Sequence, residues 1–228
     1  AHVRLALRLG ASAICEKPLV LNPWNLDQLA ALESESDGKV YTILQLRLLE
    51  TLQRIREEVL EQSDVDNDVV LTYVTRRGRW YHVSWKGSLE KSGGLGTNIG
   101  IHLFDLMLWM FGSVKRSEVH LRDDDRMSGC LHLERARVRW YLSTREEDVP
   151  AERLVEGKPA FRSLTRNGDE IEFSGGFTDL HTESYRRILA GEGFGIDDAR
   201  PSIDLVSKVR QDALTVSEPE TAHPWAQR

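Results

Sequence analysis

The sequence has few cysteines, no long apolar stretch and no excess of positive charge. Of its 228 residues only Cys15 and Cys130 are cysteines, and both lie in apolar, strand-like sequence without a second Cys or a His at metal-ligand spacing. We therefore expect reduced core thiols in a cytoplasmic protein, and no metal site.

The most apolar stretch, residues 101–111, is interrupted by His102 and Asp105 and is shorter than the roughly 20 residues that cross a bilayer. The first ten residues, AHVRLALRLG, are typical of an amphipathic helix fragment rather than of a signal peptide. The net charge of -6 gives no general attraction to phosphate. We therefore expect neither a membrane nor a nucleic acid as partner. An apolar content of 40% and a charged content of 29% predict a folded globular chain.

The first 47 residues predict a parallel α/β unit. Residues 11–16 form a short apolar strand that Lys17-Pro18 ends, because proline cannot donate to a strand ladder. Asn25 is the expected N-cap of the next helix, and residues 39–47 (KVYTILQLR) predict the second strand. A strand, a helix and a strand in this order form a parallel crossover.

Residues 48–216 predict a second α/β domain with a large, mostly antiparallel open sheet, and residues 217–228 a flexible tail. A helix is expected over about 50–61, followed by a strand (VVLTYVTRR) and a loop over 78–94. Further strands are expected at SEVHLR, GCLHLE, ARVRWYLS, FRSLTR and EIEFSG, and helices at roughly 179–190 and 201–214, the second begun by Pro201.

The segment RRGRWYHVSWKG, residues 76–87, gathers basic and aromatic residues in an otherwise acidic chain. Arginine binds phosphate or carboxylate through two hydrogen bonds, and tryptophan stacks on a base or sugar. A small polyanionic ligand with a flat ring would fit such a cluster. A solvated strand end whose Trp80 and Trp85 fill the core is the alternative, and composition alone leaves both open.

The segment SGGLGTNIGIHLFD, residues 92–105, predicts the start of a buried helix. At about 100° per residue, Asn98, His102, Asp105 and Trp109 share one stripe while the other faces are apolar. An unpaired polar group there would cost about 1 to 3 kcal/mol, so the stripe needs partners or a ligand. Asn98 and His102 would otherwise bond neighbouring loops. For Asp105 we favour a structural role, orienting His102 or holding a loop.

Lys17 stands at the carboxyl end of a predicted parallel strand, where ligands bind in open α/β sheets. Together with Gly93-Gly94 and the Asn98, His102 and Asp105 spacing downstream, the Glu16-Lys17-Pro18 tripeptide resembles the Gfo/Idh/MocA oxidoreductase family. That family carries an E-K-P motif after its fifth Rossmann strand and a G-G-x-x-x-[DN]-x-x-x-H-x-x-D helix. The match extends over nearly the whole chain.

The resemblance implies that residues 1–47 are the C-terminal part of a dinucleotide-binding Rossmann domain and residues 48–216 the substrate-binding and oligomerisation domain. Within the family, AICEKPLVLNPWN, TILQLRL and ERARVRWYLS resemble the WlbA/WbpB-type UDP-2-acetamido-2-deoxy-glucuronate 3-dehydrogenases. This resemblance implies that NAD is the cofactor and that the enzyme oxidises the C3 hydroxyl of a UDP-sugar acid for surface polysaccharide synthesis. It also implies a homo-oligomer (dimer or tetramer) joined through the open sheet. The next enzyme in the pathway would be an aminotransferase.

Site roles follow from the same resemblance. His102 is the expected base and Lys17 holds the reacting oxygen, although a Lys17 with a lowered pKa would serve as the base instead. The other expected roles are substrate binding by Asn98, Arg79, Trp80, Lys86, Thr97 and Asp105, and cofactor binding by Glu16, Lys17, Pro18 and Gln45.

Two departures from the family pattern affect the interpretation. No G-x-G-x-x-G turn, which would hold the cofactor diphosphate, occurs in the 228 residues, and we expect further sequence upstream. Leu49-Glu50 also stands where relatives carry His-Pro. Two alternatives therefore stay open: a truncated, non-catalytic fragment that binds a sugar nucleotide or oligomerises, and a family member that acts on another sugar or an inositol.

Overall fold

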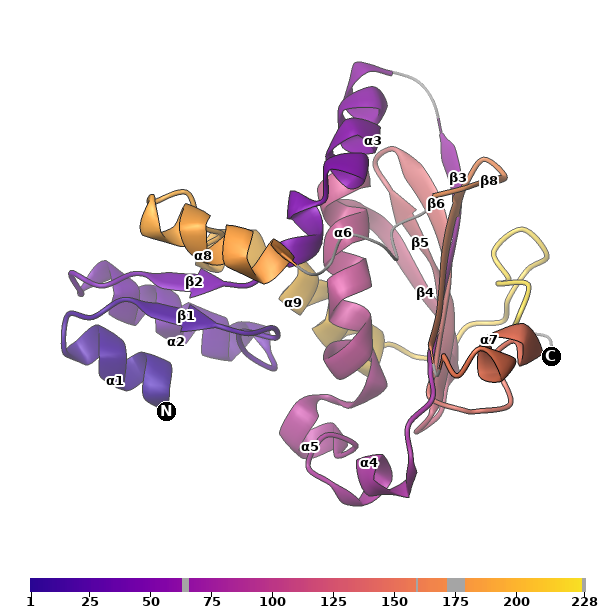
Figure 1. Cartoon of the computed structure of the whole chain (residues 1–228), viewed down its shortest axis with the longest axis horizontal. Helices are drawn as coiled ribbons and strands as arrows, with labels where there is room; N and C mark the ends of the chain where they lie inside the picture. The colour runs from indigo at the N-terminus through magenta and orange to yellow at the C-terminus, as the bar shows by residue number, and fades with distance from the viewer. Residues whose placement is uncertain (63–65, 159, 172–178, 227–228) are drawn as a thin grey trace.

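The computed structural model describes residues 1–62, 66–158, 160–171 and 179–226, apart from the side chains of Arg79 and His82. A small N-terminal α/β unit lies beside a larger unit in which helices pack on one face of a broad sheet (Figure 1). The fold class is therefore the expected one, a short parallel sheet followed by a larger mixed sheet.

The N-terminal unit is built on two short parallel strands, β1 (Ala13–Cys15) and β2 (Val40–Thr42), with Ala13 opposite Val40. Helices α1 (His2–Arg8) and α2 (Pro23–Ser34) flank them. The expected cap at Asn25 is wrong, because Asn22 caps α2 by accepting a hydrogen bond from the Asn25 N–H at 2.9 Å. Pro23 fills the first turn, where a missing N–H costs nothing, so the helix starts earlier.

The second strand is shorter than residues 39–47. It ends at Thr42, and a 3₁₀ turn, η1 (Gln45–Leu48), follows while every side chain from 43 to 48 stays buried. An uninterrupted apolar run does not distinguish a buried strand from a buried turn, since neither exposes a face to water. The turn directs Arg47 toward the larger unit.

Six strands within the described residues form the larger sheet, in the order β4-β5-β6-β3-β7-β8. β3 runs parallel to β6, and all other neighbours are antiparallel. The strands are β3 (Asn67–Thr75), β4 (Val114–Arg122), β5 (Arg126–Leu133), β6 (Ala136–Ser143), β7 (Ala160–Arg166) and β8 (Asp169–Glu170). The expected strand EIEFSG continues into residues 172–178, which lie outside the described part of the chain.

Three helices pack against one face of this sheet: α3 (Glu50–Glu61), α6 (Ile101–Phe111) and α9 (Ile196–Gln211) (Figure 1). Phe104 of α6 meets Trp140 of β6 edge to face, with ring centroids 5.1 Å apart. Gly129 on β5 makes room for that indole, because a Cβ there would lie 2.6 Å from Trp140 and 2.1 Å from the Glu118 carbonyl oxygen.

Helix α8 (Leu180–Leu189) covers the β1–β2 sheet on the side opposite α1 and α2 (Figure 1). After it, α9 begins at Ile196 rather than at Pro201, since Asp198 accepts a hydrogen bond from the Gly195 N–H at 2.8 Å and caps the helix there. Pro201 lies inside the helix. Between the two helices, the Thr42 N–H donates to the Phe194 carbonyl at 2.9 Å, which ties this segment to β2.

Much of residues 217–226, for which we expected a flexible tail, packs on the other face of the sheet. His223 is fully buried and lies 3.0 Å from the Thr72 hydroxyl, and Trp225 stacks on Phe161 at 5.2 Å. Two aromatic rings give this short segment enough apolar area to remain bound to the sheet. Short helix α7 (Ala151–Val155) lies beside it (Figure 1).

The rest of that face carries charged side chains. Asp68 pairs with Arg137 and Arg139, and Glu118 lies within 3.2 Å of His120 and His132.

No described helix is long and apolar enough to span a bilayer. Cys15 and Cys130 are both free thiols, as expected.

Candidate functional site

Two segments that are 81 positions apart in the sequence meet at Lys17. The Lys17 Nζ donates a 2.8 Å hydrogen bond to the backbone carbonyl of Asn98. Lys17 follows β1 at its carboxyl end, and a cis peptide bond joins it to Pro18, which is half-buried. The strand end and the helix start singled out by the sequence therefore form one site.

The chain enters α6 through a tight, glycine-dependent turn. Helix α5 (Leu89–Ser92) ends at Gly93 and Gly94, whose φ values of 79° and 70° lie in the left-handed region that favours glycine. A Cβ on Gly93 would lie 2.6 Å from the Thr97 side chain. A π-helical turn, η2 (Gly96–Gly100), follows, so Asn98 lies within it rather than in the regular α-helix that was expected. Single π turns occur frequently at functional sites.

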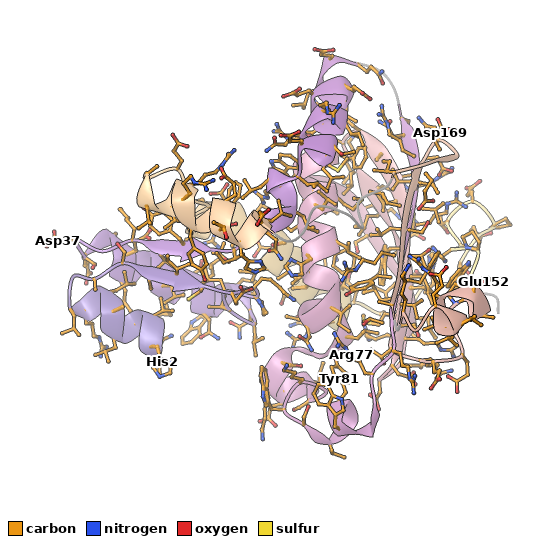
Figure 2. The ribbon with its side chains drawn as sticks, in the orientation of Figure 1. His2, Asp37, Arg77, Tyr81, Glu152 and Asp169 are labelled. Atoms are coloured by element: carbon orange, nitrogen blue, oxygen red, sulfur yellow. The ribbon has the colours of Figure 1, made fainter. Side chains whose placement is uncertain are left out.

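The Asn98 side chain holds the preceding loop in place. Its Nδ2 donates to the Tyr81 hydroxyl at 3.1 Å and to the Lys86 carbonyl at 3.3 Å. Tyr81 is a buried residue of α4 (Arg79–Val83), and Figure 2 shows it with Arg77 on the α4 side of the sheet. Asn98 thus links the π turn to the basic and aromatic segment.

His102 lies one turn further along, in the first turn of α6, and is half-buried. Burial lowers the pKa of its imidazole well below the usual value, and the positive charges of Lys17, Arg162 and His181 lower that pKa further. The ring is therefore neutral at pH 7 and able to accept a proton. A substrate that brought negative charge would raise the pKa again.

The ammonium group of Lys17 is also perturbed. Burial lowers the pKa of Lys17 to about 8, while the Glu16 carboxylate raises it and the positive charges of Arg77 and Lys86 lower it. A lysine of this kind releases its proton in the mildly alkaline range.

Positive charge dominates this part of an acidic chain. The positive charges that act on Lys17 and His102 come from loops, a strand and a helix of both units: Lys17, Arg77, Lys86, Arg162 and His181. Exposed Glu16 lies next to Lys17, and its carboxylate is 3.1 Å from the ring of His181 on α8. Clustered cations of this kind attract and hold anions.

The two tryptophans of the 76–87 segment face solvent, whereas Tyr81 is buried. Trp80 is 52% and Trp85 60% exposed, so they do not fill the core as the second interpretation of this segment required. The Lys86 Nζ lies 5.7 Å from the Trp80 ring centroid and 5.9 Å from that of Trp85. These rings offer a flat apolar surface beside a cation. The Arg79 side chain lies outside the described part of the structure.

Asp105 serves a buried ion pair. Arg47 donates to both carboxylate oxygens, at 2.9 and 2.7 Å, and also to the Asp198 carbonyl at 3.0 Å. Burial raises the pKa of Asp105, opposed by the hydrogen bonds and charge of Arg47. With only 3% exposure, Asp105 joins η1, α6 and α9. These contacts fit the structural role favoured from the sequence.

Thr97 and Gln45 are buried near the site. The Thr97 hydroxyl and the Gln45 side-chain carbonyl have no hydrogen-bond partner among the described residues, and neither has the hydroxyl of Thr42 at the end of β2. No group of His, Cys, Asp and Glu side chains in the described ranges could hold a metal ion.

Sequence reasoning missed Arg162, His181, Tyr81 and Arg47. Arg162 and His181 lie in stretches without a motif, and only the strand register and the position of α8 bring them to His102. Arg47 carried a readable signal, a charged residue within the apolar run LQLRLL.

Known proteins match this fold. Residues 68–153 match the model of the oxidoreductase family, C-terminal alpha/beta domain. The WlbA (WbpB) dehydrogenase from Thermus thermophilus, solved with NAD and alpha-ketoglutarate, is 50% identical with a TM-score of 0.93, and the match covers 98% of this chain and 72% of that one. Its complex with NAD and UDP-GlcNAcA is 49% identical over the same shares, with a TM-score of 0.92.

A WlbA dehydrogenase from Bordetella pertussis shares the fold at 15% identity, with a TM-score of 0.74 over 96% of this chain and 75% of that one. The family match and the 50% identity agree with the E-K-P tripeptide and the Gly-Gly helix start. The chain belongs to the Gfo/Idh/MocA oxidoreductase family.

Proposed function

We propose that this protein is an NAD-dependent dehydrogenase that oxidises the C3 hydroxyl of UDP-GlcNAcA, the UDP-linked 2-acetamido-2-deoxy-glucuronate. One observation carries the proposal: the Lys17 ammonium bonds to the π turn that leads into His102, within a cluster of positive charge. The half-identical Thermus thermophilus dehydrogenase, whose structure contains NAD and UDP-GlcNAcA, supports this choice of ligand.

The charge of the site and its exposed tryptophans suit such a ligand. UDP-GlcNAcA carries a diphosphate, a carboxylate and a flat uracil. We assign its binding to Asn98, Thr97, Arg79, Lys86 and Trp80. Arginine and lysine bind the anionic groups, and the exposed Trp80 indole stacks on the ring. Asp105 contributes indirectly, by holding α6 against η1 through Arg47.

His102 acts as the base in this proposal. Its imidazole is neutral in the free protein, and the negative charges of the substrate raise its pKa as the ligand enters, so that it accepts the hydroxyl proton. Lys17 donates a hydrogen bond to the same oxygen and stabilises its negative charge. With a pKa of about 8, Lys17 is itself a competent base.

The residues present also fit the cofactor. Thr42 ends β2 and Gln45 follows it, at the same sheet end as Lys17, and their buried oxygens, which have no partner among the described residues, offer acceptors to a polar ligand. We assign Glu16, Lys17, Pro18 and Gln45 to the nicotinamide side of the NAD site. NAD, when bound, supplies the acceptor for the hydride that leaves C3. The protein's own part is to orient the sugar and remove the hydroxyl proton.

We further propose a cytoplasmic homo-oligomer, dimer or tetramer, that associates through the open sheet face. That face carries the buried pair of Glu118 with His120 and the partly exposed pair of Asp68 with Arg139, which suit a self-complementary contact. Sedimentation equilibrium tests this association, and a monomer at micromolar concentration would contradict it.

The 3-keto product is the substrate that an aminotransferase needs, so we place such an enzyme next in surface polysaccharide synthesis.

NADH formation from NAD and UDP-GlcNAcA tests the catalytic proposal. We expect Lys17→Ala and His102→Ala to lower kcat by about 10² to 10⁴, because each removes a group that acts on the reacting oxygen. Lys39→Ala, which removes an exposed lysine at the start of β2, is the control. Wild-type protein that forms no NADH, or variants as active as wild type, would overturn the proposal.

A further inference from the structure

Arg162 is placed toward the site by the register of the sheet. It lies opposite Tyr73 in the antiparallel β3–β7 pair, two residues from the buried pair Leu71 and Leu164. Side chains two residues apart on a strand share a face, so Tyr73 and Arg162 lie on the face that carries α6. Phe161, one position away, belongs to the aromatic cluster on the other face.

Tyr73 holds the guanidinium of Arg162 in one orientation. The Arg162 Cζ lies 4.8 Å from the Tyr73 ring centroid, and its Nη2 donates a 3.0 Å hydrogen bond to the Tyr73 hydroxyl. A guanidinium stacked and bonded in this way loses little further freedom when it binds a ligand. Arg162 is half-buried, so its charge is partly shielded from water.

Arg162 also acts electrostatically on His102, which lies on α6. Its charge is one of three that lower the pKa of the His102 imidazole, together with Lys17 on the β1 side and His181 on α8. Lys17 of the N-terminal unit and Arg162 of the large sheet therefore both act on the charge of His102, and Arg162 lies on the sheet face that carries α6, the helix of His102. A sugar bound with its C3 hydroxyl at His102 would meet both cations.

We propose that Arg162 binds the carboxylate of the sugar and thereby selects a uronic acid over a neutral hexose. The carboxylate is attached to C5, which is two ring bonds from C3, so the group that binds it must lie near the group that acts on C3. A guanidinium forms two parallel hydrogen bonds with a carboxylate. The inference rests on the proposed function and adds the residue that determines its specificity.

Calorimetric titration of the 228-residue chain with UDP-GlcNAcA and with UDP-GlcNAc, which has a hydroxymethyl group in place of the carboxylate, tests the inference. We expect Arg162→Met to weaken binding of the acid by about 10- to 100-fold and to leave binding of the neutral sugar unchanged, since one charge-assisted pair is lost. Arg162→Lys should retain part of the preference, and Tyr73→Phe most of it.

Arg166→Met is the matched control. Arg166 lies on the same strand and face, but it bonds to Asn67 at 2.7 Å and pairs with Glu58 of α3, at the other end of β7. Its removal should change neither affinity. Arg162→Met that weakens both ligands equally, or neither, would overturn the inference alone. Wild-type protein that binds neither ligand would overturn the proposed function and the inference with it.

Discussion

Lys17 should reduce the stability of the fold at neutral pH, because its charge is held in a poorly solvated place. The pKa of Lys17 falls from 10.5 to about 8 on folding, mainly through burial. Each unit corresponds to about 1.4 kcal/mol, so the charged form costs at most about 3.5 kcal/mol at pH 7.

The sign of the pH dependence follows from proton binding. Between pH 8 and 10.5 the unfolded chain binds more protons at Lys17 than the folded chain does, so the free energy of unfolding rises with pH in that window. The cost is full below pH 8 and absent above pH 10.5. A Lys17→Met variant lacks this group and should lack this rise.

Urea unfolding of wild type and Lys17→Met at several pH values measures the effect. At pH 7 we expect the variant to be as stable as wild type or more stable, and its advantage to shrink by about 2 to 3 kcal/mol by pH 10.5. Lys39→Met corrects for the loss of one exposed positive charge. A difference between Lys17→Met and wild type that stayed constant with pH would refute the reasoning.

Three further predictions concern the site and its support. An NMR titration of His102 should give a pKa below 6.5 in the free protein and a higher pKa with UDP-GlcNAcA bound, because the ligand's negative charge opposes the cations; an unchanged value would contradict this. Asp105→Asn should lower the free energy of unfolding by about 3 kcal/mol, since it leaves the buried Arg47 charge unpaired, and a loss below 1 kcal/mol in urea would argue against a structural ion pair. Gly129→Ala should cost about 1 to 3 kcal/mol, because its Cβ has no space beside Trp140, and an unchanged melting temperature would contradict that crowding.

The main elements were predictable because their apolar patterns are periodic and their ends carry strong signals. The helix over 50–61 has the predicted bounds, and Gly191, with a φ of 82°, follows the helix over 180–189. The starts of α2 and α9 were not predictable in the same way. Asn22 and Asp198 provide the capping contacts there, whereas Asn25 and Pro201 are the more obvious signals in the sequence. A local pattern does not rank such alternatives.

The site was readable only in part. Lys17, Asn98 and His102 occupy motif positions, and the structure brings them together. Arg162 and His181 reach the same place through pairing of distant strands and the return of α8 to the N-terminal unit. Sequence separation alone carries no information on such contacts, so these two residues required the structure.

The central claim is that the site removes hydrogen from C3 of the sugar. UDP-GlcNAcA labelled with deuterium at C3 tests it directly, by proton NMR of the NADH formed from unlabelled NAD. The account predicts deuterium at C4 of the nicotinamide and its loss from the sugar product, with the yield strongly reduced in His102→Ala. NADH without deuterium, formed while the sugar kept its label, would contradict it.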